Sequence, residues 1–210
     1  MFADAMAPDA QVVVLVFAKA PIPGKVKTRL MPSLDAKQAC DVHVALLERT
    51  LAVACRAFSP ARVQLWAGLE PTHPTLEALA ACHGIARHAQ SSGDLGRRMH
   101  AALCAQQGPA LLIGSDCPVL TPILLARCAR ALVDHDLVLL PAEDGGYALI
   151  GGVRPHCGVF EAIEWGGRDV TAQTLERARA LGLHVACPET VWDIDTPRDL
   201  ERWRNLDDST

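Results

Sequence analysis

The sequence predicts a single-domain α/β fold with a mostly parallel central sheet and helices on both of its faces. Apolar, often β-branched runs at 11–19 (QVVVLVFAK), 110–116 (ALLIGSD) and 136–142 (DLVLLPA) are typical of strands buried on both faces. Segments with apolar residues at helical spacing separate these runs, so strand and helix alternate along the chain. The 210 residues, 50% of them hydrophobic, suffice for one domain with a substantial core.

The other elements follow from the same patterns. Further strands are expected at 62–68, 84–90, 147–152, 184–189 and 191–195. Helices are expected at about 35–57, 74–82, 94–107, 121–133 and 170–181, and again from residue 196. Thr121-Pro122 and Thr196-Pro197 each place a capping hydroxyl before a proline at the first helical position. We predict a flexible tail over residues 1–10 and one folded domain over residues 11–205.

Composition limits the classes of partner. The net charge of −4 lacks the basic excess of a general nucleic-acid binder, and 4% aromatic residues argue against stacking platforms for single strands. The eight cysteines form no CxxC or CxxxC pair, which favours scattered buried thiols over a zinc site. The first ten residues lack the basic region of a signal peptide, and no run approaches the ~18 apolar residues of a membrane helix. We therefore expect a cytoplasmic protein without a nucleic-acid or membrane partner.

A basic loop directly follows the first predicted strand. It carries Lys19, Lys25, Lys27 and Arg29, and Gly24 permits a close approach of the backbone to a ligand. In an extended loop, the alternation of Lys25, Lys27 and Arg29 would place all three on one side. The first strand-to-helix turn commonly holds phosphates in α/β proteins, so we predict phosphate binding here. The spacing matches neither a Walker A loop nor a dinucleotide-binding glycine motif, and a solvated basic turn is the alternative.

Two aspartates at the ends of distant apolar runs indicate a metal site. Asp116 closes the strand at 110–116, and Asp195 ends the run at 191–195. Ligands of open parallel sheets bind outside the carboxyl ends of the strands, where two carboxylates would suit a hard divalent cation. Asp193 would face the same side of a strand as Asp195, so one could bind the metal and the other orient it; we favour Asp195 for the metal. A turn or helix cap is the alternative role for Asp116 and Asp195.

Three further segments contribute candidate residues. Glu143 and Asp144 end a buried strand on the same predicted edge as Asp116, so either is a candidate for acceptor contact or general base. An ordinary Asp-Gly hairpin turn is the alternative there. In SSGDLGRRM, Gly93 and Arg98 lie at a helix start that offers free N–H groups to an anion, although Asp94 could cap that helix instead. The run EWGGRDV contains a turn after Trp165 that would close over an acceptor.

Taken together, five segments in this order resemble a family of small bacterial proteins in the nucleotide-diphospho-sugar transferase superfamily, which has a GT-A-type fold. The segments are FAKAPIPGKVKTRL, GDLGRRM, GSDCPVL, PAEDGGYALIGG and WDIDTPRDL. The resemblance spans about residues 11–205. The family is described as glycosyltransferases, some linked to arsenosugar biosynthesis, and is related to 2-phospho-L-lactate and molybdenum-cofactor guanylyltransferases. KVKTRL is similar to the basic loop of the former.

The resemblance implies specific roles. A nucleotide would lie over the first strand, and Mg²⁺ or Mn²⁺ would bridge its phosphates to Asp116, with Asp195 as the second metal carboxylate. Two features depart from related enzymes: the basic loop replaces a glycine-rich loop, and Asp116 lacks the paired aspartate of an Asp-x-Asp motif. The implied nucleotide-binding residues are Ala18, Lys19, Gly24, Lys25, Lys27, Arg29, Gly93, Arg98 and Ser115, and the implied acceptor residues are Gly145, Gly146, Tyr147 and Trp165.

Three functions are compatible with these residues. In a glycosyltransferase, the cation and the basic loop would stabilise the departing nucleoside diphosphate, and Asp144 or Glu143 would activate an acceptor hydroxyl. In a nucleotidyltransferase, the same groups, including Lys25, would stabilise charge around the α-phosphate and the departing pyrophosphate. A non-catalytic nucleotide-binding module is the third interpretation. We favour a metal-dependent glycosyltransferase that uses a nucleotide-diphospho-sugar and a small-molecule acceptor.

Overall fold

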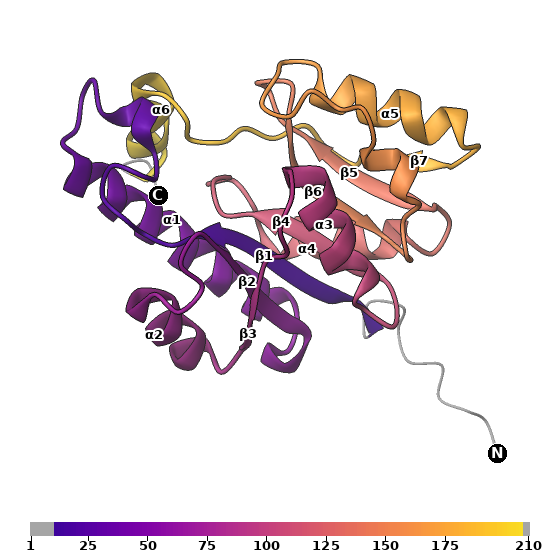
Figure 1. Cartoon of the computed structure of the whole chain (residues 1–210), viewed down its shortest axis with the longest axis horizontal. Coiled ribbons are helices and arrows are strands. Elements are labelled where there is room, and N and C mark those ends of the chain that lie inside the picture. The colour runs from indigo at the N-terminus through magenta and orange to yellow at the C-terminus, as the bar shows by residue number, and fades with distance from the viewer. Residues whose placement is uncertain (1–10, 208–210) are drawn as a thin grey trace.

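Strand β1 (Val13–Lys19) occupies the middle of the sheet, as its apolar sequence predicts (Figure 1). The computed structural model describes residues 11–207, so the predicted tail at 1–10 lies outside the described residues. Within that range the strands form one seven-stranded sheet in the order β3-β2-β1-β4-β6-β5-β7. Neighbouring strands pair in parallel except at β6, which is antiparallel to both β4 and β5. The predicted α/β fold with a mostly parallel sheet is confirmed.

The remaining strands are short and mostly lie where apolar runs predict them. Their bounds are β2 (Val63–Gly68), β3 (Ala86–Ala89), β4 (Ala110–Gly114), β5 (Leu137–Pro141), β6 (Tyr147–Gly152) and β7 (Val185–Ala186). β7 is much shorter than the run 184–189 suggests.

The run at 191–195 is not a strand, which corrects the sequence prediction. Val191 makes only an isolated parallel bridge to Ala142. Trp192 and Ile194 alternate with aspartates as in a strand, but they pack with Leu30, Leu46 and neighbouring side chains instead of against the sheet.

Six helices lie between and after the strands in the described range. They are α1 (Ala36–Ala57), α2 (Pro74–His83), α3 (Leu95–Cys104), α4 (Pro122–Ala131), α5 (Val170–Ala180) and α6 (Pro197–Asp207). Local capping explains several starts: the side chains of Asp35, Asp94 and Thr121 each accept a hydrogen bond from a backbone N–H in the first turn. No helix within residues 11–207 is long and apolar enough to cross a membrane.

The alternation of side chains along β1 divides the core between the two faces of the sheet. Val14 and Val16 pack in a cluster with α1, α2 and α4, whereas Leu15 and Phe17 pack in a second cluster with α3 and α5. Helices therefore cover both faces, as predicted. In Figure 1, α6 lies beside the first turns of α1, and Leu200 of α6 joins Leu46 of α1 in a third cluster.

The cysteines are free thiols, but only three of them are buried as predicted; Cys55 is partly buried and four are exposed. Cys82, Cys104, Cys157 and Cys187 are exposed on the described surface. Cys117, next to Asp116, is buried, and burial raises the pKa of its thiol to about 12. Burial thus favours the neutral thiol at this position.

Gly151 gives a direct test of the sheet. A Cβ at this position would lie 2.5 Å from Leu111 Cδ2 and 2.9 Å from the Ala110 carbonyl oxygen. Substitution Gly151→Ala should therefore lower the free energy of unfolding by about 1–3 kcal/mol, because it overpacks β6 against β4. The matched control Gly108→Ala should change it little, since a Cβ there meets nothing within 4 Å. Equal urea midpoints for the two variants would contradict this packing.

Candidate functional site

A cavity of about 560 Å³ lies where the carboxyl ends of β1 and β4 meet the amino end of β6. Because β6 runs opposite to its neighbours, its first residues reach the same edge of the sheet. Most of the predicted site residues line this cavity. They are Ala18, Lys19, Lys25, Lys27, Arg29, Arg98, Ser115, Asp116, Asp144, Gly146, Tyr147, Trp165, Asp193 and Asp195.

Backbone hydrogen bonds bring the segment 191–195 across this edge. Val191 N–H donates to the Pro141 carbonyl (2.8 Å), and Glu143 N–H donates to the Val191 carbonyl (3.0 Å). Farther along, Ile194 N–H donates to the carbonyl of Asp116 (3.0 Å). The segment thus passes from the end of β5 to the end of β4, which explains why it does not continue as a strand. Asp193 and Asp195 reach the same cavity as Asp116 by this path.

The basic loop is not extended, so the extended conformation predicted to place Lys25, Lys27 and Arg29 on one side is wrong. Thr28–Leu30 forms a 3₁₀ turn, and Lys27 before it adopts the left-handed conformation (φ 48°, ψ 36°). This conformation costs about 1–2 kcal/mol for a residue with a Cβ. Lys25, Lys27 and Arg29 nevertheless all line the cavity. Gly24 adopts a positive φ of 77° in a turn outside the lining, so its predicted contact with the nucleotide is not supported by its position.

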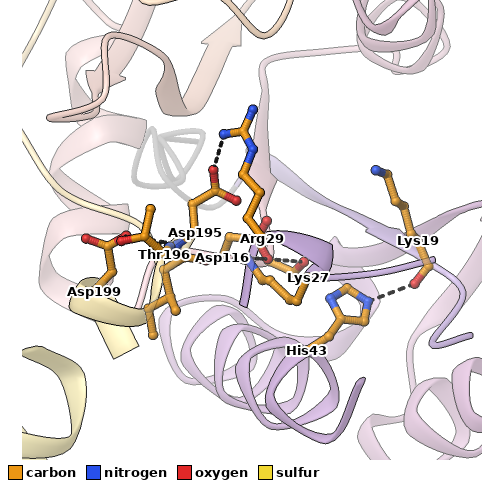
Figure 2. A network of polar contacts seen from close by, with 10 residues as sticks. Lys19, Lys27, Arg29, His43, Asp116, Asp195, Thr196 and Asp199 are labelled. Atoms are coloured by element: carbon orange, nitrogen blue, oxygen red, sulfur yellow. Dashed lines mark hydrogen bonds and ion pairs between the residues drawn. The ribbon is translucent and has the colours of Figure 1, made fainter. Parts of the chain in front are cut away.

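Two ion pairs join this loop to the aspartates (Figure 2). The ammonium of Lys27 lies 2.9 Å from Asp116 Oδ1 and donates to the Ile194 carbonyl at 2.5 Å. The guanidinium of Arg29 pairs with Asp195. The Lys27 side chain is only 5% exposed, whereas that of Arg29 is 68% exposed. The two predicted metal carboxylates are therefore both next to cationic side chains, but only one of these cations is buried.

Asp193 has the most perturbed carboxyl of the cavity. Burial, followed by the negative charges of Asp144 and Asp116, raises its pKa to about 6. Asp195 adds to this shift, and Lys27 opposes it. Several carboxyl groups thus interact at this edge. The capping role is taken by Asp199, whose Oδ2 accepts from the backbone N–H of Thr196 (2.7 Å) and of Asp195 (3.2 Å). The Asp195 carboxylate itself therefore stays directed toward Arg29 and the cavity.

Glu143 lies after β5 at the predicted sheet edge, but its side chain does not line the cavity. Its carboxylate forms a bidentate ion pair with Arg202 of α6 (2.8 and 3.1 Å). This pair lowers the pKa of Glu143. The Arg202 guanidinium also lies 4.1 Å from the centroid of the Trp192 ring. Asp144, the adjacent residue, does line the cavity, and its Oδ1 accepts from Gly146 N–H at 2.8 Å.

An aromatic wall forms the other end of the cavity. Tyr147 and Trp165 contact each other edge to face, with ring centroids 6.4 Å apart. A Cβ at Gly96 would lie 2.5 Å from the Trp165 ring, so this glycine is required for the indole to pack on α3. Gly145 lies outside the lining, because it packs on the backbone of Arg168 with no room for a Cβ. Gly93 also lies outside the lining, although Arg98 from the same segment is included.

Among the lining residues that the sequence interpretation missed, His43 and Gln90 make hydrogen bonds that position the site. His43 of α1 is buried, its Nε2 lies 2.9 Å from the Lys19 carbonyl oxygen, and burial lowers its pKa. This contact holds the imidazole against the end of β1. Gln90 follows β3, donates to the Trp66 carbonyl (2.9 Å) and accepts from Arg98 (2.7 Å). Its place after a strand could have identified Gln90, but nothing in the helical pattern distinguishes His43.

The carboxylates of the cavity suit a metal ion that also binds the phosphates of a ligand. They do not suit a metal ion held by protein side chains alone. Within residues 11–207, no group of three or more His, Cys, Asp or Glu side chains is arranged to hold a metal ion. Mg²⁺ in nucleotide enzymes typically takes one or two carboxylates and completes its shell with phosphate and water. Asp116 and Asp195, with Asp193 nearby, offer such carboxylates in a cavity that also contains the lysines of the basic loop.

A comparison with protein families identifies the family of this chain. The family model described as "Uncharacterized protein conserved in bacteria (DUF2064)" matches residues 50–167, more than half of the 210 residues. The chain belongs to this family. The matched part includes Asp116, Asp144 and Trp165, and the basic loop and the segment 191–195 lie outside it. No curated protein matches the chain in sequence.

Several solved structures have the same fold as this protein. A protein from Desulfovibrio desulfuricans G20, provisionally named a nucleotide-diphospho-sugar transferase, superposes with a TM-score of 0.80 at 29% identity over 89% of this chain and 83% of its own. The 4-diphosphocytidyl-2C-methyl-D-erythritol synthase of Anaerococcus prevotii DSM 20548 shares the fold at 12% identity (TM-score 0.64, 97% of this chain and 99% of that one). The molybdopterin-guanine dinucleotide biosynthesis protein A of Archaeoglobus fulgidus does so at 18% (TM-score 0.55, 94% and 100%).

The raised pKa of Asp193 predicts a pH-dependent effect on stability. The folded state favours the neutral carboxyl of Asp193, so the charged carboxylate lowers the stability of the protein. This loss of stability is absent below the ordinary pKa of 3.8 and complete above about 6. Asp193→Asn should therefore raise the thermal midpoint by a few degrees at pH 7 and leave it nearly unchanged at pH 4. Thermal unfolding with a chelator present at both pH values tests this. An equal shift at both pH values would contradict the assignment.

Proposed function

We propose that this protein transfers a sugar from a nucleotide-diphospho-sugar to a small-molecule acceptor, with the help of Mg²⁺ or Mn²⁺. The observation that carries the proposal is the cavity in which cations of the basic loop meet aspartates from three separate segments. Such a cavity suits a ligand that has a diphosphate at one end and a reacting carbon at the other. The neutral aromatic wall, next to Asp144, is suited to the less charged part of the substrates.

The basic loop would act on the leaving group. When the bond between the sugar and the diphosphate breaks, negative charge develops on the departing phosphate. Lys25 and Arg29 would stabilise this charge, because both line the cavity and their side chains are exposed enough to approach a phosphate. His43 and Gln90 would position the end of β1 and Arg98, respectively, through the contacts described above.

Asp116 and Asp195 would hold the divalent cation, with Asp193 as a neighbour that orients the pair. The cation would supply Lewis-acid stabilisation of the diphosphate. Asp144 is the better candidate for activating the acceptor, since it lines the cavity and Glu143 is paired with Arg202. In this role, the Asp144 carboxylate would accept the proton of the attacking acceptor group.

The similarity to the Desulfovibrio protein, at 29% identity and a TM-score of 0.80, supports a transferase that acts on a nucleotide-diphospho-sugar, because that protein is provisionally named as one. The alternative, a nucleotidyltransferase that releases pyrophosphate, is favoured by one observation: the five cationic side chains that line the cavity, Lys19, Lys25, Lys27, Arg29 and Arg98, are enough for a triphosphate. A link to arsenosugar chemistry rests on the sequence resemblance alone.

A ligand panel separates the two reactions. With Mn²⁺ present, we expect one nucleoside diphosphate and its sugar conjugate to raise the thermal midpoint, and the matching triphosphate to raise it less. A ligand at one hundred times its dissociation constant adds about 2.7 kcal/mol of stability, which a thermal-shift assay detects readily. Preference for a triphosphate would instead indicate nucleotidyl transfer. A nucleotide-induced shift without turnover of any sugar conjugate or triphosphate would indicate a non-catalytic module.

A pair of neighbouring variants tests the catalytic assignment. Asp144→Asn should lower the transfer rate about 10²–10⁴-fold, the usual contribution of a general base. Glu143→Gln should retain most of the rate, because its carboxylate contacts α6 and not the cavity. Product formation from the sugar conjugate identified by the panel would be measured for both. A larger loss in Glu143→Gln than in Asp144→Asn would reverse the two roles.

A further inference from the structure

We propose that Lys27 is an internal counter-ion that occupies Asp116 until phosphate enters the cavity, so that the divalent cation binds with the nucleotide and not before it. This inference rests on the proposed function, because it concerns the same cation and the same phosphates. It assigns to Lys27 a role different from simple phosphate binding. Lys27 controls when one predicted metal carboxylate becomes available.

The contacts of Lys27 carry the first step. Its ammonium lies 2.9 Å from Asp116 Oδ1 and donates to the carbonyl of Ile194, a residue that lies between Asp193 and Asp195 (Figure 2). It therefore occupies the space between the two segments that provide the predicted metal ligands. A divalent cation bound at Asp116 would have the ammonium as its neighbour, and the two positive charges would repel each other strongly in this partly buried site.

The fold delivers Lys27 to this position without help from a ligand. Its two flanking anchors, Val26 and Leu30, are 3% and 0% exposed, and Leu30 packs with Trp192 and Ile194. Lys27 keeps a left-handed backbone conformation that a lysine rarely adopts, which indicates that the surrounding packing determines it. The side chain has a four-carbon stem, whose rotations would let the ammonium turn from Asp116 toward a phosphate in the cavity that it lines.

The ion pair between Arg29 and Asp195 differs from that of Lys27, because its cation is not buried. Arg29 and Asp195 have side chains that are 68% and 34% exposed, so water screens their attraction and Asp195 can exchange partners easily. The Lys27 side chain is 5% exposed, although that of Asp116 is 44% exposed. If Asp116 turned to a divalent cation, the buried ammonium would keep the Ile194 carbonyl and the nearby charge of Asp193 but would lose its ion-pair partner. A phosphate group supplies the replacement anion. Phosphate and the divalent cation should therefore increase each other's affinity, as thermodynamic linkage requires.

The test measures Mn²⁺ binding by water-proton relaxation and by electron paramagnetic resonance, without any turnover. Wild-type protein should bind Mn²⁺ weakly alone, and inorganic pyrophosphate should produce a protein-bound Mn²⁺ signal. Lys27→Met should bind Mn²⁺ alone about tenfold or more tightly than wild type, because the competing charge is gone. The control Lys25→Met removes a charge from the same cavity without freeing a carboxylate, and it should gain less than about threefold. Lys27→Met combined with Asp116→Asn should lose the gain.

The outcomes separate this proposal from the proposed function. Wild-type protein that binds Mn²⁺ alone as tightly as with pyrophosphate would overturn it, even if Lys27→Met does not fold. Equal Mn²⁺ affinities of wild type and folded Lys27→Met would overturn it as well. Folding of each variant is checked by circular dichroism and thermal unfolding. Failure of every sugar conjugate to react would reject the proposed transfer, yet the Mn²⁺ result for Lys27→Met would still stand, since it needs no nucleotide.

Discussion

The hydrogen bonds that hold the segment 191–195 across the strand ends are the constraint on which the site depends. A sheet edge presents the ends of its strands, but the chain after β7 must return over that edge to bring carboxylates to Asp116. Three backbone hydrogen bonds, to Pro141, from Glu143 and to Asp116, fix this return. Trp192 and Ile194 anchor it on the other side by packing with α1 and α6. The charges in the cavity then follow from where these bonds place the backbone.

The electrostatics of the cavity show how such a site is tolerated before any ligand binds. Aspartates close enough to raise the pKa of Asp193 would repel one another if no cations were present. The basic loop supplies those cations, although it lies more than 160 residues before Ile194 and Asp195 in the sequence. The opposite charges reduce the repulsion in the free protein, and they also provide the groups that a phosphate would require. One set of side chains thus serves both the stability of the empty site and its recognition of anions.

Local patterns were sufficient to predict most of the fold and much of the site. Apolar runs and helical spacing identified the strands and helices, and the rule that ligands bind at carboxyl strand ends brought Asp116 and the basic loop together. The failures are long-range effects. Nothing near Glu143 in sequence reveals that Arg202, 59 residues later, holds its carboxylate. The run VWDID has the period of a strand, but its apolar side chains pack on helices. The left-handed conformation of Lys27 also depends on tertiary packing around Val26 and Leu30.

The contacts of α6 with the site have a consequence for folding during synthesis. Arg202 contacts both the Trp192 ring and Glu143, so the last helix braces the segment of the aspartates and the turn that carries Asp144. During synthesis, β1 emerges among the first residues and can pair with β2 and β4 while translation continues. The cavity beside it cannot be completed until residues 191–202 have left the ribosome. A chain that still lacks these residues would therefore lack Asp193 and Asp195, so the full set of carboxylates in the cavity is among the last features to form during synthesis.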